Sequence, residues 1–330
     1  MSWTISTREH SPPPCGKECR SRCIRPQHAL ACCFAECRKN VQEPAVRESS
    51  PVRECPACKV QTFHTYLFAV NRCRIWRCTS CGLGSTDVAD FDPGDYYTAD
   101  YFSGKHRDGY ADYRGAERVL RHEFARTVQF IRRFRGSGRL LDIGCAYGFF
   151  LKEARAFFDI AGIEIAEQAA EACRRAGLNV CSGIADDANM SKIGVVDVIT
   201  LLDVIEHLPQ PHETLALCQR QLTPGGVILI TTGDFGSFGA RLLGARWRLM
   251  TPPQHLWFFT RESLRRMAGR LGLSIIHFDH PAKIVPLSLI AFQLRRMLGL
   301  PNSARADASQ IGVPINLFDA MRIVLQKDAS

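Results

Sequence analysis

Short apolar runs and amphipathic stretches alternate along most of this chain. Residues 195–201 are almost continuously apolar or β-branched, which is typical of a strand buried on both faces. Residues 116–134 repeat apolar positions at helical spacing with arginines between them, which predicts an amphipathic helix on one face of a sheet. Further strands are predicted at 139–142, 160–164, 178–181, 227–232 and 273–279, and further helices at 149–158, 166–176, 215–222 and 261–271.

The turn after the strand at 139–142 carries two glycines, Gly144 and Gly148, and leads into the helix at 149–158. A Cβ at these positions would block close approach of a ligand and the positive φ that such turns need. A strand, a glycine turn and a helix together let a cofactor lie against backbone at the carboxyl end of a parallel strand. The next strand ends in Glu164, about twenty residues on, where an acid can accept hydrogen bonds from two ribose hydroxyls.

The stretch Asp142-Ile-Gly-Cys-Ala-Tyr-Gly-Phe-Phe-Leu151, followed by Gly162-Ile-Glu164, resembles motif I and the acidic loop of class I S-adenosylmethionine (SAM)-dependent methyltransferases. The resemblance continues, in the family's order and spacing, through residues 196–208, 222–231 and 252–260. It implies an α/β fold with a Rossmann-like sheet of seven strands, six parallel and one antiparallel. Residues 315–326 match the family's closing antiparallel strand.

The resemblance also implies SAM as the cofactor. SAM would lie over residues 144–148, with its ribose on Glu164 and its adenine beside residues 184–187. The cofactor-binding residues implied in this way are Asp142, Gly144, Cys145, Gly148, Glu164, Ile165, Ile184, Asp186, Asp187 and Asp203. For the two acids after Ile184, a solvated turn is the alternative.

The candidate catalytic residues follow the strand at 195–201. Its carboxyl end brings Glu206 and His207 to the crevice where ligands of such sheets bind. A histidine there can remove the acceptor proton as the methyl group transfers. His255 is a further candidate for the acceptor site, with a buried packing role as the alternative.

Two other interpretations of the same residues stay open. Asp203-x-x-Glu206-His207 resembles the E-x-x-E-H metal ligands of ubiquinone-pathway O-methyltransferases, which implies a second metal site for Mg²⁺ or Zn²⁺. Alternatively, Asp203 is the N-cap of the next helix, with Glu206 completing a capping box.

Two C-x2-C motifs, Cys55/Cys58 and Cys78/Cys81, are separated by nineteen residues. This spacing predicts a zinc ribbon in which each motif supplies two thiolates to one ion and a β-hairpin connects them. Four thiolates complete a tetrahedron, so the zinc is expected to be structural. A zinc ribbon ahead of this core resembles a broad bacterial group that includes sugar and ubiquinone-pathway methyltransferases.

Composition and charge indicate the class of protein and its cellular compartment. The 330 residues are 46% hydrophobic, contain fifteen cysteines and carry a formal charge of +9. No apolar run reaches the roughly 18 residues of a membrane span, and the first residues lack a signal-peptide pattern, so a cytoplasmic protein with metal-bound rather than disulfide-bonded cysteines is expected.

Four segments are predicted. Residues 1–54 form a Cys-rich extension expected to be disordered, with a second metal site as the alternative, and residues 55–85 form the ribbon. Residues 86–114 form a linker over the cofactor pocket, or a surface linker with aromatic anchors. Residues 115–330 form the methyltransferase domain, with an apolar C-terminal lid helix at 284–300. A dimer helix or an anchor at a membrane surface are the alternatives for 284–300.

The predicted function is methyl transfer to oxygen, nitrogen or carbon of a small-molecule acceptor, such as a saccharide, a nucleotide-sugar or another anionic metabolite. The alternative is a nucleic-acid-directed methyltransferase or an inactive zinc-ribbon binding module, since a basic chain also suits nucleic acid. Leu202-Asp-Val-Ile205 does not match the N-P-P-Y-like motif of base N-methyltransferases, which argues against base N-methylation. The sequence predicts no oligomeric state.

Overall fold

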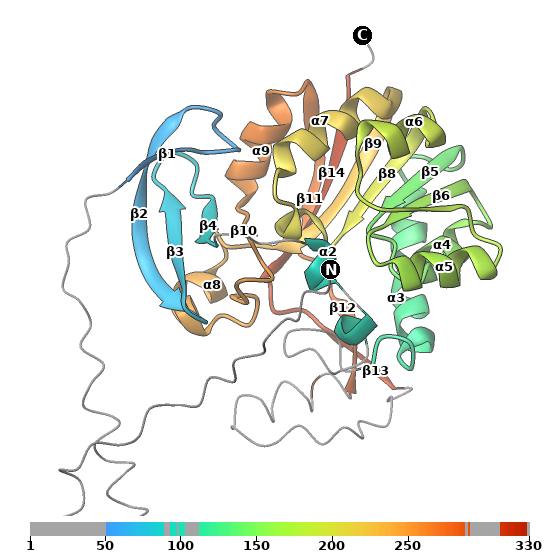
Figure 1. The fold of residues 1–330 in the computed structure, drawn as a ribbon, viewed down its shortest axis with the longest axis horizontal. Coiled ribbons are helices and arrows are strands. Elements are labelled where there is room, and N and C mark those ends of the chain that lie inside the picture. The colour runs from blue at the N-terminus through green and yellow to red at the C-terminus, as the bar shows by residue number, and fades with distance from the viewer. Residues whose placement is uncertain are drawn as a thin grey trace, which may run out of the picture. The chain divides into compact units, whose positions relative to one another are not determined.

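A seven-stranded sheet with the strand order β11-β14-β9-β8-β5-β6-β7 forms the larger part of the structure (Figure 1). Its strands are β5 (Arg139–Ile143), β6 (Asp159–Glu164), β7 (Val180–Ser182), β8 (Val196–Leu202), β9 (Leu222–Gly233), β11 (Leu273–Asp279) and β14 (Ala320–Lys327). β14 pairs antiparallel with both of its neighbours, whereas the other pairs are parallel. The predicted sheet of six parallel strands and one antiparallel strand is therefore confirmed.

The computed structural model describes residues 51–88, 93–97, 99–102, 112–287, 290 and 311–328. All of these belong to one unit, residues 49–330. The predicted extension at 1–54 therefore lies outside the described residues, apart from its last four positions.

Helices cover both faces of the sheet because apolar side chains alternate across each strand. On one face, α3 (Glu117–Ile131), α4 (Phe149–Ala154) and α5 (Glu167–Arg175) pack on inward side chains such as Leu140 and Val198. On the other face, α6 (Asp187–Ile193), α7 (Pro211–Gln221) and α9 (Arg261–Gly269) pack on side chains such as Ile199 and Ile228. These two cores hold the carboxyl ends of the strands at one edge.

The N-terminal described residues form a second, five-stranded antiparallel sheet with the order β1-β2-β3-β4-β10. Its strands are β1 (Val52–Glu54), β2 (Gln61–Val70), β3 (Cys73–Cys78), β4 (Gly84–Asp87) and β10 (Trp257–Phe258). β2 and β3 form the hairpin expected of the zinc ribbon. β10 comes from the methyltransferase part of the chain and pairs with β4, so the ribbon sheet continues into that part.

Short elements complete the described chain. They are α2 (Pro93–Tyr96), η2 (Ala99–Phe102), η3 (Ile205–His207), α8 (Phe238–Leu243), η4 (Gly244–Arg246), β12 (Lys283–Pro286) and β13 (Gly312–Ile315). None of the described helices combines the length and the apolar character that a membrane crossing requires.

The start of the predicted lid helix at 284–300 is wrong. Ile284 to Pro286 lie in β12, which pairs antiparallel with β13, and Leu287 is the first residue with helical geometry. Two β-branched residues favour a strand here, and Pro286 in a helix interior would remove a hydrogen bond and clash with the preceding turn. Most of the remaining predicted helix lies outside the described residues.

Candidate active site and zinc ribbon

The glycine turn lies at the point where the strand order of the sheet reverses. β5 has β6 on one side and β8 on the other, and successive connections leave it in opposite directions. Gly144 has φ +73°, and a Cβ there would lie 2.7 Å from Val204 Cγ2. Gly148 has φ +69°, and a Cβ there would lie 2.5 Å from Leu178 Cδ1. Both positions therefore require glycine, and ligands of open α/β sheets bind at such a reversal.

Glu164 ends β6 and is almost fully buried beside this turn. Its two carboxylate oxygens accept hydrogen bonds from the backbone N–H groups of Ala146 over 2.7 Å and Ala166 over 2.8 Å. Burial raises the pKa of Glu164, and these backbone hydrogen bonds oppose that shift. Each carboxylate oxygen has a second lone pair, so the predicted ribose hydrogen bonds remain available to the carboxylate.

Three other predicted cofactor residues, next to the turn or at the end of β6, differ in their burial and hydrogen bonds. Asp142 is buried inside the sheet and accepts a hydrogen bond from Thr200 Oγ1 over 2.6 Å. Cys145 is buried and donates its backbone N–H to Ile163 O over 3.2 Å. Ile165 is half-buried.

The loop predicted to frame adenine has local partners of its own. Asp186 is the N-cap of α6, and its Oδ1 accepts from the backbone N–H of Asn189 over 2.8 Å. Asp187 is exposed and pairs with Arg220 over 2.8 Å. Ile184 is more than half exposed. Their assignment to adenine stays a prediction.

Aromatic side chains of the linker pack against the glycine turn. Tyr101, Phe102 and Tyr113 form one buried cluster with Phe149 of α4 and the neighbouring Tyr147. The Tyr113 and Phe149 rings stack with centroids 5.3 Å apart. The described part of the linker therefore packs on Tyr147 and Phe149, within and next to the glycine turn.

Asp203 follows β8 in a left-handed conformation, with φ +57°. Its Oδ1 accepts from Lys283 Nζ over 2.7 Å and from Thr231 Oγ1 over 3.0 Å, and its Oδ2 lies 2.5 Å from the same ammonium. Burial alone would raise the pKa of Asp203, but the Lys283 ammonium outweighs it, so this pKa lies below its ordinary value. Asp203 is therefore a paired carboxylate next to the reaction edge.

The alternative in which Asp203 caps the following helix is wrong. The next turn is η3, whose N-cap is Val204 without a side-chain hydrogen bond, and α7 begins later, after Gln210. The carboxylate of Asp203 faces Lys283 instead, because the left-handed backbone at Asp203 turns it away from the N–H groups of η3.

Glu206, His207 and His255 come together next to Asp203. Each supplies a ligand atom, and these atoms lie within 4.8 Å of one another. The two imidazole centroids are 4.8 Å apart. His207 Nδ1 lies 2.8 Å from Gln254 O, and His255 Nδ1 lies 2.8 Å from Leu249 O. A carbonyl only accepts, so Nδ1 carries the proton in both rings and each Nε2 keeps a lone pair.

Burial dominates the proton affinities of these three groups. It raises the pKa of Glu206 to about 8, with the Asp203 charge adding to the shift. It lowers the pKa of His207, and it lowers that of His255 to about 3 with a further contribution from His207. Glu206 Oε2 is buried and has no hydrogen-bond partner among the described residues. Three polar groups thus converge in a site from which water is largely excluded.

The metal-ligand set differs from the expected one in one member. Asp203 is absent from the group that can hold an ion, and His255 takes its place beside Glu206 and His207. Both Asp203 oxygens instead bind the Lys283 ammonium. The expected set used three residues close in sequence, whereas His255 comes from the loop between α8 and α9.

The four predicted zinc ligands come together in the ribbon. Cys55 Sγ lies 3.6 Å from Cys81 Sγ, and Cys58 Sγ lies 4.0 Å from Cys78 Sγ. A tetrahedral zinc with Zn–S bonds of about 2.3 Å requires sulfurs about 3.8 Å apart. The cluster therefore fits one zinc with four thiolates and no open position.

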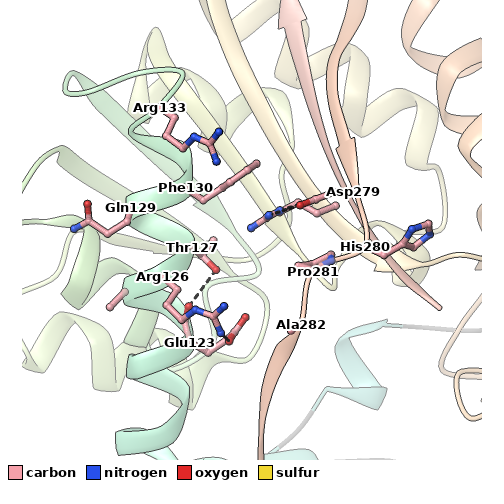
Figure 2. A pocket seen from close by; sticks show the side chains of 12 residues that line it. Glu123, Arg126, Thr127, Gln129, Phe130, Arg133, Asp279, His280, Pro281 and Ala282 are labelled. Atoms are coloured by element: carbon pink, nitrogen blue, oxygen red, sulfur yellow. Dashed lines mark hydrogen bonds and ion pairs between the residues drawn. The ribbon is translucent and has the colours of Figure 1, made fainter. Parts of the chain in front are cut away.

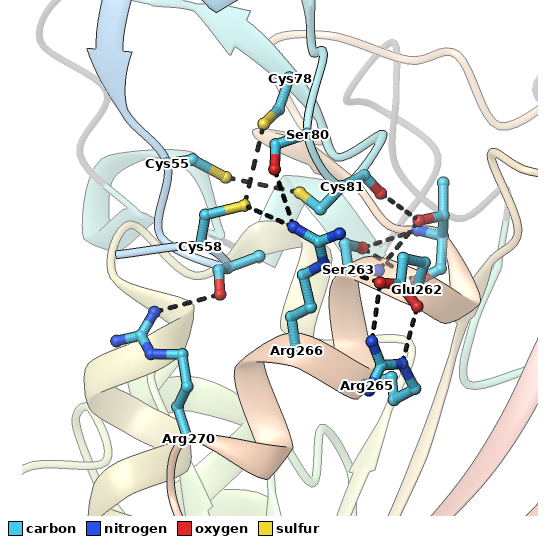
Figure 3. Close-up of polar contacts among 12 residues, drawn as sticks. Cys55, Cys58, Cys78, Ser80, Cys81, Glu262, Ser263, Arg265, Arg266 and Arg270 are labelled. Carbon is cyan, nitrogen blue, oxygen red and sulfur yellow. Dashed lines mark hydrogen bonds and ion pairs between the residues drawn. The ribbon is translucent and has the colours of Figure 1, made fainter. Parts of the chain in front are cut away.

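Basic side chains of α9 attach this cluster to the methyltransferase domain (Figure 3). Arg266 Nη1 donates to Ser80 Oγ over 2.8 Å and lies 3.8 Å from Cys58 Sγ. Arg270 Nη1 donates to Ala57 O over 3.2 Å. A guanidinium beside a cluster of four thiolates offsets part of its negative charge.

Sequence reasoning missed several residues that build the site. Lys283 was assigned to no role, although its ammonium is the partner of Asp203. Gln254 orients His207 through its carbonyl, and its Nε2 donates to Tyr101 Oη. The only available signal for Lys283 was a single charge within an apolar stretch, which is too common to identify a partner 80 residues away.

Comparisons with known proteins agree with this geometry. A family model described as "Methyltransferase domain" matches residues 114–278, half of the chain. The chain is 30% identical over 191 residues to a ubiquinone biosynthesis O-methyltransferase of Methylococcus capsulatus, covering 52% of this chain and 79% of that protein. A protein of the same name from Bordetella avium is 28% identical over 164 residues, with 44% and 67% covered.

Among solved structures, a SAM-dependent methyltransferase from Archaeoglobus fulgidus matches with a TM-score of 0.46 and 20% identity, covering 68% of this chain and 98% of that one. The family match and the sheet topology lead to one conclusion: the chain belongs to the methyltransferase-domain family and is a class I SAM-dependent methyltransferase.

Proposed function

We propose that this methyltransferase transfers the methyl group of SAM to a hydroxyl of a small, anionic acceptor, such as a saccharide, a nucleotide-sugar or a related metabolite. The observation that carries the proposal is the convergence of Glu206, His207 and His255, with both Nδ1 atoms fixed by carbonyls, at the carboxyl end of β8. The O-methyltransferase names of the relatives support oxygen as the accepting atom.

The proposed SAM site is the glycine turn with Glu164. When bound, SAM supplies the methyl group as an electrophile. Gly144 and Gly148 keep the backbone free of Cβ atoms at the reversal of the strand order, and Glu164 offers lone pairs for the ribose hydroxyls. The aromatic cluster around Tyr101 and Phe102 keeps water away from this turn.

In the proposed reaction, His207 Nε2 accepts the proton of the acceptor hydroxyl. Burial keeps the imidazole neutral, so its lone pair is available, and the Gln254 carbonyl fixes the ring. His255 and Glu206 close the site around the hydroxyl. A positioned general base of this kind contributes about 10² to 10⁴ in rate.

Lys283 is the proposed source of preference for an anionic acceptor. Its ammonium lies beside Asp203 at the edge where the acceptor would enter, and its side chain is partly exposed. A cation next to a paired carboxylate can bind a further anionic oxygen, because an ammonium has three donors.

The same three residues also suit a divalent metal. Two imidazole Nε2 atoms and one carboxylate are ligands that Zn²⁺ and other transition metals accept, and each imidazole is held at its second nitrogen in the way that metal-binding histidines usually are. A metal there would lower the pKa of the acceptor hydroxyl, and His207 would then be one of its ligands and no longer the general base.

The test is calorimetric titration with SAM, with metal analysis of the same sample, followed by transfer of labelled methyl groups to a panel of hydroxylated anionic compounds. Micromolar SAM affinity and labelled product would support the proposal. His207→Gln should keep SAM affinity and lose turnover. A folded, zinc-loaded protein that does not bind SAM would overturn the proposal, and a metal content of two rather than one would favour the metal at Glu206.

A further inference from the structure

A groove lies between α3 and the segment that connects β11 to β12 (Figure 2). It has a volume of about 690 Å³, which is within the range of small-molecule sites. Arg126 of α3 and Arg133 of the turn after it stand on one wall, and Asp279 and Pro281 lie on the opposite wall. None of these residues belongs to the candidate active site described above.

The segment that contains α3 and the residues on either side of it is strongly basic. Residues 114–135 contain seven arginines and two glutamates, more than half of the formal charge of +9 of the whole chain. Arg118, His122 and Arg126 of α3 are exposed and lie on one face, because residues four apart on a helix share a face, and Arg133 is exposed in the turn that follows α3. A second pocket of about 660 Å³ shares Arg126 and adds Arg118 and His122, so the groove continues along the helix.

The acids of the groove are already engaged. Asp279 binds Arg322 through both oxygens, over 2.9 Å and 2.5 Å. Glu123 accepts from the backbone N–H of Ile284 over 2.9 Å and lies 3.7 Å from Arg126. In the part of the chain that the structure describes, Arg118 and Arg133 form no ion pair. The groove therefore offers guanidinium groups without matching free carboxylates.

The lining of the groove is partly apolar. The Arg322 guanidinium lies 3.4 Å from the centroid of the buried Phe130 ring and covers one of its faces, and the Arg133 guanidinium lies 5.7 Å from the same centroid. Pro281 and Ala282 continue the apolar lining. The arginines of the groove suit a compound that carries a phosphate, since Arg binds phosphate oxygens bidentately.

The groove borders the proposed acceptor site. Ala282 lines the groove, and the next residue, Lys283, reaches Asp203 on the reaction edge. The segment Asp279–Ile284 thus has the groove on one side and the candidate active site on the other. A molecule that extends past this segment can place one end at each.

We propose that the groove binds the phosphate or diphosphate group of the methyl acceptor, through Arg126 and Arg133. This inference rests on the proposed function and narrows its acceptor to a phosphate-bearing compound. The acceptor extends from these arginines past Lys283 to the hydroxyl that receives the methyl group.

The experiment is calorimetric titration of the full chain with pyrophosphate at low ionic strength. Arg126→Gln/Arg133→Gln should weaken pyrophosphate binding by about tenfold or more, because two charge-assisted contacts are lost. The control is Arg174→Gln/Arg175→Gln on α5, which removes the same charge from two exposed ion pairs. Its affinity should stay within about twofold of the wild type.

The outcomes separate the two proposals. The groove proposal would be overturned if the wild type did not bind pyrophosphate. It would also be overturned if both double variants bound pyrophosphate equally weakly, because the overall charge would then explain the binding. SAM titration of the same samples is the independent readout. If the protein binds SAM but not pyrophosphate, the proposed function stands and the groove proposal fails. If it binds pyrophosphate but not SAM, the groove is a phosphate site and the proposed function fails. Tighter binding of uridine diphosphate than of pyrophosphate would support an organic phosphate over the free ion.

Discussion

Thr86 in the zinc ribbon donates a hydrogen bond from Oγ1 to the backbone carbonyl of His255 over 2.8 Å. The backbone N–H of Thr86 donates to Leu256 O over 2.9 Å, and the N–H of Leu256 donates to Glu206 O over 2.9 Å. One strand of the ribbon and the turn after β8 thus hold the His255 segment from two sides. The ribbon is therefore part of the wall of the candidate active site.

Replacing Thr86 by Val should move His255 while leaving the fold intact. The lost hydrogen bond costs about 1 kcal/mol, and β4 keeps its backbone pairing with β10. We expect shifted imidazole signals of His255 in the nitrogen NMR spectrum of the variant, with SAM affinity within about twofold of the wild type.

Thr79→Val is the matched control, because Thr79 Oγ1 donates to Phe63 O over 3.0 Å inside the ribbon and contacts no part of the His255 segment. Identical imidazole spectra for Thr86→Val and the wild type would contradict the positioning role of Thr86.

Cys58→Ser should release the zinc and open the ribbon. The wild type should contain about one zinc per chain, because four sulfurs complete one tetrahedron. Without it, amide hydrogen exchange should increase across residues 51–88 and also at β10, which pairs with β4.

Cys73→Ser provides the comparison within the same hairpin, because Cys73 lies outside the group of four cysteines that can hold an ion. Zinc retained by Cys58→Ser, or lost from Cys73→Ser, would show that the ligands have been assigned wrongly.

Glu164→Ala should weaken SAM binding by about tenfold or more, since the ribose loses its hydrogen-bond acceptor. The variant also leaves the N–H groups of Ala146 and Ala166 without their partner. Glu164→Gln is the milder variant, because its amide oxygen can still accept one of these two backbone hydrogen bonds.

Calorimetry and thermal unfolding without SAM are the two measurements for this series. Glu171→Ala, which removes an exposed acid of α5, should leave both unchanged. Full SAM affinity in both Glu164 variants would refute the ribose assignment.

Asp142 should make the protein less stable as the pH rises from about 4 to about 7. Burial raises its pKa from 3.8 to about 7, against the hydrogen bond from Thr200. In this window the native carboxyl holds its proton and the unfolded one does not, so stability decreases with pH and the loss is complete above about 7. The loss should be on the order of 4 kcal/mol.

Denaturant unfolding at several pH values measures this effect. Asp142→Asn should flatten the curve between pH 4 and 7, whereas Asp159→Asn, which removes an exposed carboxylate paired with Arg139, should not. A curve for Asp142→Asn parallel to that of the wild type would mean that Asp142 does not titrate in this range.

The sequence predicted the features that are encoded locally. Continuous apolar runs such as the one at 195–201 gave the buried strands, because burial on both faces demands apolar side chains on both. The glycine turn and the two C-x2-C motifs are contiguous patterns that carry their geometry with them. Each of these features depends on neighbours within a few residues.

Only the tertiary structure decided which polar groups meet. Asp203 and Lys283 are 80 residues apart, and Thr86 and His255 are 169 apart. These pairs form because β12 passes the end of β8 and because β10 extends the ribbon sheet. The sequence could place Asp203 only among its neighbours, so it predicted a helix cap and a metal ligand there. A single polar residue has no periodic pattern, and its partner depends on how distant elements pack.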